Sequence, residues 1–265
     1  MRTFVTILLI ALALFIINPF STCGEPDETL HKKCLYPTVR VHQVGVPAGG
    51  SGVIIRSEKI GEEYHNVAIT CAHVTEDCSK GVEVDLFIYE NWSKIAEVVT
   101  YKCKIYHAHE DKDLSILLFT SDRQLPVADL GMDEKLYIGN DIIKIGCGLG
   151  DEPRLDFGKI TSVFAKNDFA KGMKLYRTNA MTIYGDSGGP VFHNNRVIGF
   201  AQAIRIMRGL PIFHMAFIIP ADRIKLLDTE ANHTLGFIYN SDKKLPVLPF
   251  SILKLEGYEI IRENE

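Results

Sequence analysis

The sequence predicts an all-β protein whose strands fall into two successive sets. Short runs of apolar and β-branched residues recur between Gly52 and Ile219, with turn-forming residues between them, a pattern typical of β-sheets. The chain has 265 residues. The roughly 240 that remain without the N-terminal segment are enough for one β domain. Because the sequence has no internal repeat or low-complexity tract, we expect one β domain rather than several.

Five predicted strands make up the first set. Each combines apolar and strand-forming residues and ends close to turn residues. They span residues 52–56, 67–70, 82–89, 95–106 and 114–119.

Six further strands make up the second set, at residues 142–146, 158–165, 174–178, 190–192, 196–203 and 213–219. Between the fourth and fifth of these, Asn194-Asn195 has the composition of a two-residue hairpin turn. Pro220-Ala221-Asp222 has the residues of a helix start, so we expect a short helix over 223–227. A tail follows, and we expect its apolar patch at 245–250 to lie against a barrel.

The N-terminus carries an uncharged apolar segment at 4–17, preceded by Arg2 and followed by small residues. This order predicts a secretory signal peptide over 1–23, cleaved between Ser21 and Gly24. The segment is shorter than the about 18 apolar residues of a membrane-spanning helix. We therefore expect a secreted or periplasmic protein without stable membrane insertion after signal removal. An uncleaved anchor and lipid attachment at Cys23 remain alternatives.

Export would place the six cysteines in an oxidising compartment, where disulfides persist. Cys71 and Cys78 lie on either side of one turn, so we expect a disulfide between them. The net charge of −4 gives no electrostatic basis for binding nucleic acid.

The segment from Gly185 to Pro190 places Ser187 among glycines, which leave its hydroxyl accessible. Two convergent backbone NH groups can stabilise the oxyanion of acyl transfer, and Gly185 and Ser187 are positioned in the sequence to supply them. Ser187 is therefore predicted as a nucleophile.

A general base and a carboxylate precede this serine. His73 follows the apolar run 67–69, where a strand gives way to a loop, and a neutral imidazole there can accept the serine proton. Asp113 stands at the start of the apolar run 114–119 and can orient that imidazole. Asp111 is the main rival carboxylate. His107 and His109 with Asp111 also offer a metal-site interpretation, but an i, i+2 histidine pair is a weak zinc motif.

The order His73, Asp113, Ser187 resembles the trypsin-like serine peptidases of chymotrypsin fold. Residues 50–55 before the histidine and 157–163 before the serine resemble the HtrA/DegP-like branch more closely. The resemblance implies two six-stranded antiparallel barrels with the active site in the cleft between them, plus a short C-terminal helix and tail. The implied boundaries are 35–225 for the protease domain, with barrels at about 35–125 and 126–225, and 226–265 for an extension.

The resemblance also implies a substrate site. Met181, six residues before the serine, would lie at the base of the pocket for the side chain that precedes the cut, which favours apolar or small side chains. Phe200, Ala201 and Gln202 would pair with the substrate backbone by β-addition.

The chain departs from the family in two respects. No Ile-Val-Gly-Gly start is present, so the new amino terminus that pairs with the aspartate before the serine has no visible source, and Asp186 needs another partner. The stretch after Pro220 is too short for the PDZ domain that often follows HtrA-like proteases.

Together these features predict an exported serine endopeptidase that acts on polypeptides without a metal or organic cofactor. The alternative is a catalytically silent homologue that binds proteins through its former cleft. The oligomeric state is left open.

Overall fold

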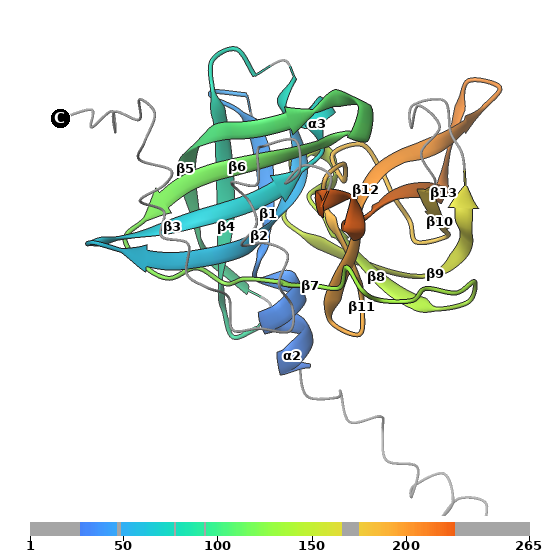
Figure 1. The fold of residues 1–265 in the computed structure, drawn as a ribbon, viewed down its shortest axis with the longest axis horizontal. Helices are drawn as coiled ribbons and strands as arrows, with labels where there is room; N and C mark the ends of the chain where they lie inside the picture. The colour runs from blue at the N-terminus through green and yellow to red at the C-terminus, as the bar shows by residue number, and fades with distance from the viewer. Residues whose placement is uncertain (1–26, 47–48, 77, 93, 166–174, 226–265) are drawn as a thin grey trace, which may run out of the picture.

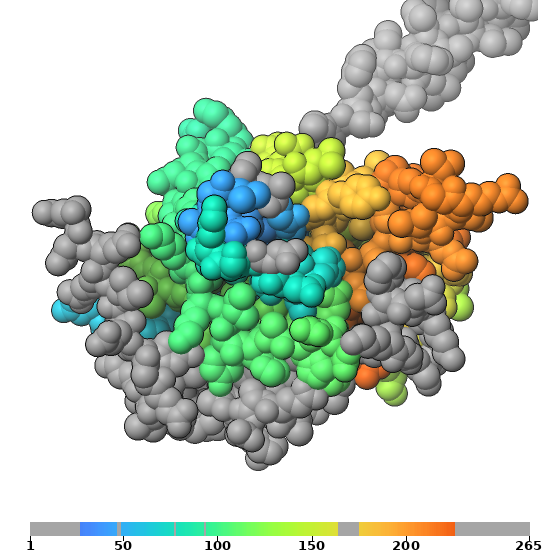
Figure 2. Space-filling model, turned by 90° about the horizontal axis from the view of Figure 1, so that it is seen from above, coloured from blue at the N-terminus to red at the C-terminus, as the bar shows by residue number. Residues whose placement is uncertain are grey.

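The computed structural model of the chain describes residues 27–46, 49–76, 78–92, 94–165 and 175–225. Two β-barrels lie side by side (Figure 1). Seen from above, the atoms of the first barrel, coloured blue to green, adjoin those of the second, coloured yellow to orange (Figure 2).

The first barrel is closed, in the order β1-β2-β3-β6-β5-β4. All six of its strand pairs are antiparallel. Alternating side chains such as Val82, Val84 and Leu86 point into its core, as the period of two in a strand requires. Its strands are β1 (Thr38–Gln43), β2 (Gly49–Ile60), β3 (Glu63–Thr70), β4 (Val82–Glu90), β5 (Lys94–His109) and β6 (Leu114–Ser121).

The second barrel follows the order β11-β8-β9-β10-β13-β12, and pairing between β11 and β12 closes it. The two-residue strand β7 (Asp129–Leu130) adds to β12 in parallel. The six barrel strands are β8 (Asp141–Gly146), β9 (Arg154–Ala165), β10 (Leu175–Thr178), β11 (Pro190–His193), β12 (Arg196–Met207) and β13 (Leu210–Pro220).

The predicted fold class is confirmed. Every predicted strand is present, several of them longer than expected, and Asn194 and Asn195 both take positive φ (51° and 59°) in the β11–β12 hairpin. The strands β1 and β7 were not predicted. β1 lacks a clean alternation of buried and exposed positions, and β7 is too short to leave a pattern.

Short helices complete the described chain. They are α2 (Glu28–Leu30), the π-helix η1 (His31–Leu35), α3 (Ala72–Thr75) and the 3-10 turns η2 (Glu110–Lys112), η3 (Gly148–Gly150) and η5 (Ala221–Arg223). η5 covers the residues predicted to start the C-terminal helix, and residues 226–227 of that helix lie outside the described part of the chain. The tail over 226–265 and the predicted signal peptide lie outside the described residues. In the part of the chain that the structure describes, no helix has the length and apolar character needed to cross a bilayer.

One core cluster joins the two barrels. It contains Ile69 and Leu114 from the first barrel together with Ile145, Phe192 and Phe200 from the second, all nearly or fully buried. Burying apolar surface across this junction fixes the relative position of the barrels. Any groups at the ends of β3, β6 and β8 are therefore held in a defined arrangement.

A largely buried ion pair on the outer face of the first barrel predicts how stability depends on pH. Arg40 Nε lies 2.9 Å from Asp85 Oδ2, and Thr100 donates to Asp85 Oδ1 at 2.6 Å. Burial alone would raise the pKa of the Asp85 carboxyl, but the hydrogen bonds from Thr100 and Arg40 outweigh it and lower the pKa. This stabilisation is present at neutral pH and is lost as the pH falls through the carboxyl's pKa in the folded state.

We expect Asp85→Asn to reduce the free energy of unfolding at pH 7 by about 3 kcal/mol, because it leaves Arg40 without its buried partner. The difference from the wild type should narrow below about pH 4, because the carboxyl of the unfolded chain then binds a proton while that of the folded chain, whose pKa is lower, stays ionised. Urea titrations between pH 3 and 7 measure this. Asp129→Asn, which removes an exposed ion pair with Lys33, should cost less than about 1 kcal/mol. If the difference in the free energy of unfolding between the wild type and Asp85→Asn stays constant down to pH 3, the prediction is contradicted.

Candidate active site

His73 and Asp113 meet at the junction of the barrels. His73 Nδ1 lies 2.8 Å from Asp113 Oδ1 and 2.9 Å from Oδ2. The backbone NH of His73 also donates to Asp113 Oδ1, at 3.0 Å. The carboxylate is buried, whereas the imidazole side chain is 43% exposed. The carboxylate thus fixes one ring nitrogen and leaves the other, Nε2, for a reacting group.

Strand register brings these two residues together. β3 pairs with β6 so that Thr70 lies opposite Ser115. The helix α3 that follows β3 therefore lies beside the turn that precedes β6. Asp113 itself has a left-handed backbone conformation (φ 52°, ψ 44°) at the end of η2, which aspartate tolerates better than most residues.

The described hydrogen bonds of His73 go to Asp113 and not to the rival carboxylate. Asp111 is exposed on η2, and Asp113 is the residue that accepts from His73. His109 binds the adjacent Lys112, accepting from its backbone NH at 3.3 Å. Among the described residues, the group that can share a metal is Cys71, His73 and Asp113, whose ligand atoms lie within 4.8 Å of one another. The pair His107 and His109 belongs to no such group.

Cys71 does not act as expected from the sequence. Its Sγ donates to Ala201 O in the second barrel at 3.3 Å, and Cys78 Sγ donates to Val74 O at 3.5 Å. Both are free thiols, so the predicted disulfide between them is wrong. Burial raises the pKa of the Cys71 thiol well above its usual range. A protonated thiol is a poor metal ligand, which favours a hydrogen-bonding role for Cys71.

Ser187 lies in a tight turn between β10 and β11. Its hydroxyl donates to Gln202 O at 3.1 Å, and the described residues contain no hydrogen bond between Ser187 Oγ and His73. The glycines on either side, Gly185 and Gly188, have φ of +95° and +83°, a conformation that strains other residues. A Cβ at Gly188 would also lie 2.3 Å from Thr70 Oγ1. The turn therefore approaches the His73 segment closely.

Ser51, a residue that sequence analysis did not single out as functional, holds this turn from the first barrel. It is fully buried. Its NH donates to Ser187 O at 2.7 Å, and its hydroxyl donates to Gly185 O at 2.7 Å while accepting from Cys147 NH. Thr70 Oγ1 in turn donates to Ser51 O at 2.7 Å. The Gly50-Ser51-Gly52 motif was visible in the sequence and contributed to the family resemblance. It did not by itself indicate a role for the Ser51 side chain.

Two peptide groups of the turn, 184–185 and 186–187, are oriented by hydrogen bonds to their carbonyl oxygens. Tyr184 O accepts from Leu149 NH at 2.7 Å, and Asp186 O accepts from Gly189 NH at 2.9 Å. The described chain has no cis peptide bond, and in a trans peptide the NH points opposite to the C=O. The NH groups of Gly185 and Ser187 therefore point away from Leu149 and Gly189 respectively.

Asp186 has the partner that the sequence did not reveal. Its Oδ2 pairs with Lys144 Nζ, and both residues have 0% exposure. Lys144 also pairs with Asp156 at 2.8 Å. The only hint in the sequence was one lysine inside an otherwise apolar run, 142–146.

The four residues predicted to bind substrate have different surroundings. Met181 is 39% exposed, in the loop before the turn. Phe200 is buried, and in the sheet it lies opposite Pro190 and Ile219. Ala201 uses both backbone groups internally: its NH donates to Gly189 O and its C=O accepts from Gly188 NH.

Two of these predictions therefore need correction. Pairing between β11 and β12 ends at Pro190 and Phe200, and the backbone of Ala201 is engaged by the turn. Phe200 and Ala201 belong to the interior of the sheet and cannot pair with a substrate backbone. An incoming strand would have to add to β12 from Gln202 onward.

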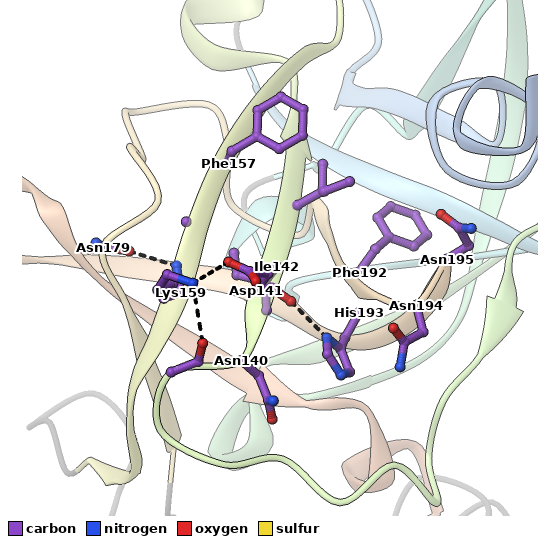
Figure 3. A pocket seen from close by; sticks show the side chains of 13 residues that line it. Asn140, Asp141, Ile142, Phe157, Lys159, Asn179, Phe192, His193, Asn194 and Asn195 are labelled. Atoms are coloured by element: carbon purple, nitrogen blue, oxygen red, sulfur yellow. Dashed lines mark hydrogen bonds and ion pairs between the residues drawn. The ribbon is translucent and has the colours of Figure 1, made fainter. Parts of the chain in front are cut away.

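A cavity of about 670 Å³ lies elsewhere on the second barrel (Figure 3). Phe157 and Phe192 form its apolar wall, while Lys159 bonds Asp141 at its polar side. The ring of His193 contacts Asp141 O at 2.7 Å. His73, Asp113 and Ser187 are not among its lining residues, so it is separate from the candidate active site.

The buried thiols give a prediction on chemical reactivity. Burial raises the pKa of the Cys34 and Cys147 thiols to about 12, which leaves a thiolate fraction of roughly one in ten thousand at pH 8. We expect both to stay unmodified by iodoacetamide in the native protein and to react fully in urea, as peptide mass spectrometry can measure. Rapid native alkylation of either thiol at pH 8 would contradict their buried, protonated state.

Comparison with known proteins defines the class. Residues 50–200, more than half of the chain, match the trypsin-like peptidase domain family. The chain therefore belongs to this family. The matched span contains His73, Asp113 and Ser187.

The curated relatives include Do-like proteases and serine proteases named HTRA1. The chain is 28% identical over 186 residues to the putative protease Do-like 14 of Arabidopsis thaliana, covering 66% of this chain and 39% of that protein. It is 27% identical to the putative serine protease HhoA of Synechocystis, covering 80% and 54%. The chain thus spans between two fifths and about half the length of these relatives. The family and these relatives support assignment of the chain to the serine peptidases.

Two solved structures share the fold. The MamO protease domain from Magnetospirillum magneticum has a TM-score of 0.61 at 18% identity, covering 75% of this chain and 98% of that one. Deg5 has a TM-score of 0.59 at 20% identity, covering 78% and 93%. At these identities the likeness concerns the fold.

Proposed function

We propose that the protein is an exported serine endopeptidase that cleaves polypeptides through an acyl-enzyme. The observation that supports this most directly is the His73–Asp113 hydrogen bond at the junction where the Ser187 turn is held by Ser51. Export rests on the predicted signal peptide alone.

In the proposed reaction, Ser187 Oγ turns from the Gln202 carbonyl toward His73 Nε2. Catalytic hydrogen bonds are often absent or long before substrate binds, so the observed contact with Gln202 is compatible with this step. His73 takes the hydroxyl proton as Oγ attacks the substrate carbonyl carbon, and Asp113 stabilises the imidazolium through Nδ1–H. The proton then passes from His73 to the leaving amine as the peptide bond breaks.

The oxyanion of the tetrahedral intermediate would be held by the NH groups of Gly185 and Ser187. Their orientation is supported by the hydrogen bonds on the opposite faces of the same peptides. A water molecule, deprotonated by His73, then attacks the acyl carbon. The proton returns to Ser187 Oγ and the carboxylic acid product leaves.

Substrate would lie along β12 beyond the point where β11 stops pairing, from Gln202 toward Ile204, by β-addition. Met181 lies in the loop before the Ser187 turn, is 39% exposed and carries no charge. We therefore propose a preference for apolar or small side chains before the cut.

One observation favours a second candidate, a catalytically silent homologue that binds proteins. Ser187 Oγ donates to Gln202 O rather than to His73. If that hydrogen bond persists in the presence of substrate, His73 cannot activate the serine, and the cleft would serve only for binding.

Reaction with a fluorophosphonate probe separates the two functions. We expect one adduct per chain, mapped by mass spectrometry to Ser187, no adduct in Ser187→Ala, and normal labelling in the control Ser162→Ala. A wild-type chain that stays unlabelled favours the silent homologue, and labelling that persists in Ser187→Ala contradicts the proposed nucleophile. Cleavage of a peptide library after lysine or arginine would contradict the proposed side-chain preference.

A further inference from the structure

Asp186, the residue before the proposed nucleophile, is a buried anion that forms an ion pair with a buried cation. Asp186 and Lys144 both have 0% exposure, and the Lys144 ammonium contacts Asp186 Oδ2. Removing two charges from water costs several kcal/mol for each ion. A pair in this position therefore requires a structural or functional reason beyond stability.

Neighbouring charges make Lys144 the principal partner. Arg154 also approaches Asp186, at 3.5 Å, but its side chain is 40% exposed and it pairs more closely with Asp156, at 2.9 Å. Lys144 lies between the two carboxylates, 2.8 Å from Asp156. Of the cations around Asp186, it is the one that water does not reach.

The pair is connected to the turn through the Asp186 carboxylate. Oδ2 accepts from Ile183 NH at 2.8 Å, at the start of the turn. The other oxygen, Oδ1, faces the backbone of Gly146, where an added Cβ would lie only 2.5 Å away. The carboxylate is thus fixed against the end of β8, the strand that carries Lys144. Its position sets that of the backbone on both sides, which contains the NH groups of Gly185 and Ser187.

We propose that Lys144 is a positioning residue for the oxyanion-binding turn. Its ammonium, supplied by the barrel wall, holds Asp186 and thereby keeps the two NH groups in the geometry that transition-state stabilisation requires. The cation comes from within the second barrel, so ordering the turn needs no amino terminus released by cleavage. This inference rests on the proposed peptidase function, because it assigns a role within that reaction.

The test compares three variants with the wild type. Lys144→Met removes the cation and keeps an unbranched side chain that is one atom shorter. Lys144→Met/Asp186→Asn removes both charges, so no buried ion is left unpaired. Lys159→Met, the matched control, removes an exposed lysine of the neighbouring strand β9. For each, kcat and KM are measured with one peptide substrate, and thermal unfolding is recorded in parallel.

We expect Lys144→Met to lower kcat about 100-fold while KM changes less than about 3-fold, because the oxyanion contacts form only in the transition state. In the double variant, which leaves no buried charge unpaired, we expect kcat to recover to about 10-fold below the wild type. Lys159→Met should retain wild-type constants. If Lys144 had a purely structural role, its replacement would lower the unfolding temperature without a loss that falls on kcat while KM stays nearly unchanged.

Wild-type kcat in either Lys144 variant overturns the proposal, as does a loss confined to KM. If Lys144→Met does not fold, the double variant decides, since it carries no unpaired buried charge. A wild-type chain that neither hydrolyses peptides nor reacts with a fluorophosphonate overturns the peptidase function and this inference with it. An active wild type with unaffected Lys144 variants overturns the inference alone.

Discussion

Ser187→Ala is expected to lower kcat for peptide hydrolysis by roughly a million-fold, close to the loss of the whole catalytic apparatus. The reason is that alanine removes the attacking oxygen, so neither the acyl-enzyme nor proton transfer to His73 can occur. The turn itself should survive, because its hydrogen bonds to Ser51 use backbone atoms of residues 185 and 187. We expect KM to change little, since the substrate still meets the same surface.

Steady-state and single-turnover kinetics on a peptide found by library profiling measure this effect. Ser162→Ala, on β9 of the second barrel, is the control and should behave as the wild type. A residual kcat within about 10-fold of the wild type in Ser187→Ala would show that another group is the nucleophile.

Asp113→Asn is expected to reduce kcat roughly ten-thousand-fold at neutral pH, with little change in KM. The carboxylate accepts hydrogen bonds from both His73 Nδ1 and the His73 backbone NH. An amide at this position can instead donate to Nδ1, which places the remaining ring proton on Nε2, where it cannot accept the serine proton. Imidazolium formed during the reaction would also lose its counter-charge.

Asp111→Asn provides the matched control, because this exposed carboxylate lies two residues away. It should leave kcat within about 3-fold of the wild type. Equal losses in the two variants would mean that the negative charge of the loop, rather than the specific hydrogen bond to His73, matters for the reaction. Fluorophosphonate labelling rates give an independent reading of the same step.

The meeting of His73 with Asp113 could be predicted from the sequence because each is marked by its local setting. His73 follows one strand and Asp113 precedes another, and the antiparallel pairing of β3 with β6 brings the two ends together. Selecting Asp113 over Asp111 depended on the resemblance to trypsin-like peptidases, which implies an aspartate followed directly by an apolar strand. The hairpin at Asn194-Asn195 was equally local, since asparagine tolerates positive φ.

Contacts that depend on tertiary structure could not be predicted in this way. Lys144 and Asp186 are 42 residues apart, and a lysine within a strand ordinarily indicates a solvent-facing position. The hydroxyl of Ser51, in the first barrel, bonds backbone groups of the second barrel. No local sequence pattern indicates such a contact. The disulfide prediction failed because proximity in sequence placed Cys71 beside Cys78, whereas the Cys71 side chain points to Ala201 in the other barrel.

The central claim is that His73 and the NH groups of Gly185 and Ser187 converge on one reacting atom attached to Ser187. A crystal structure of the fluorophosphonate adduct tests it most directly. We predict a phosphorus bonded to Ser187 Oγ, a phosphonyl oxygen about 2.7–3.1 Å from both NH groups, and His73 within hydrogen-bonding distance of the adduct. An adduct on another residue, or a phosphonyl oxygen directed away from both NH groups, would contradict the account.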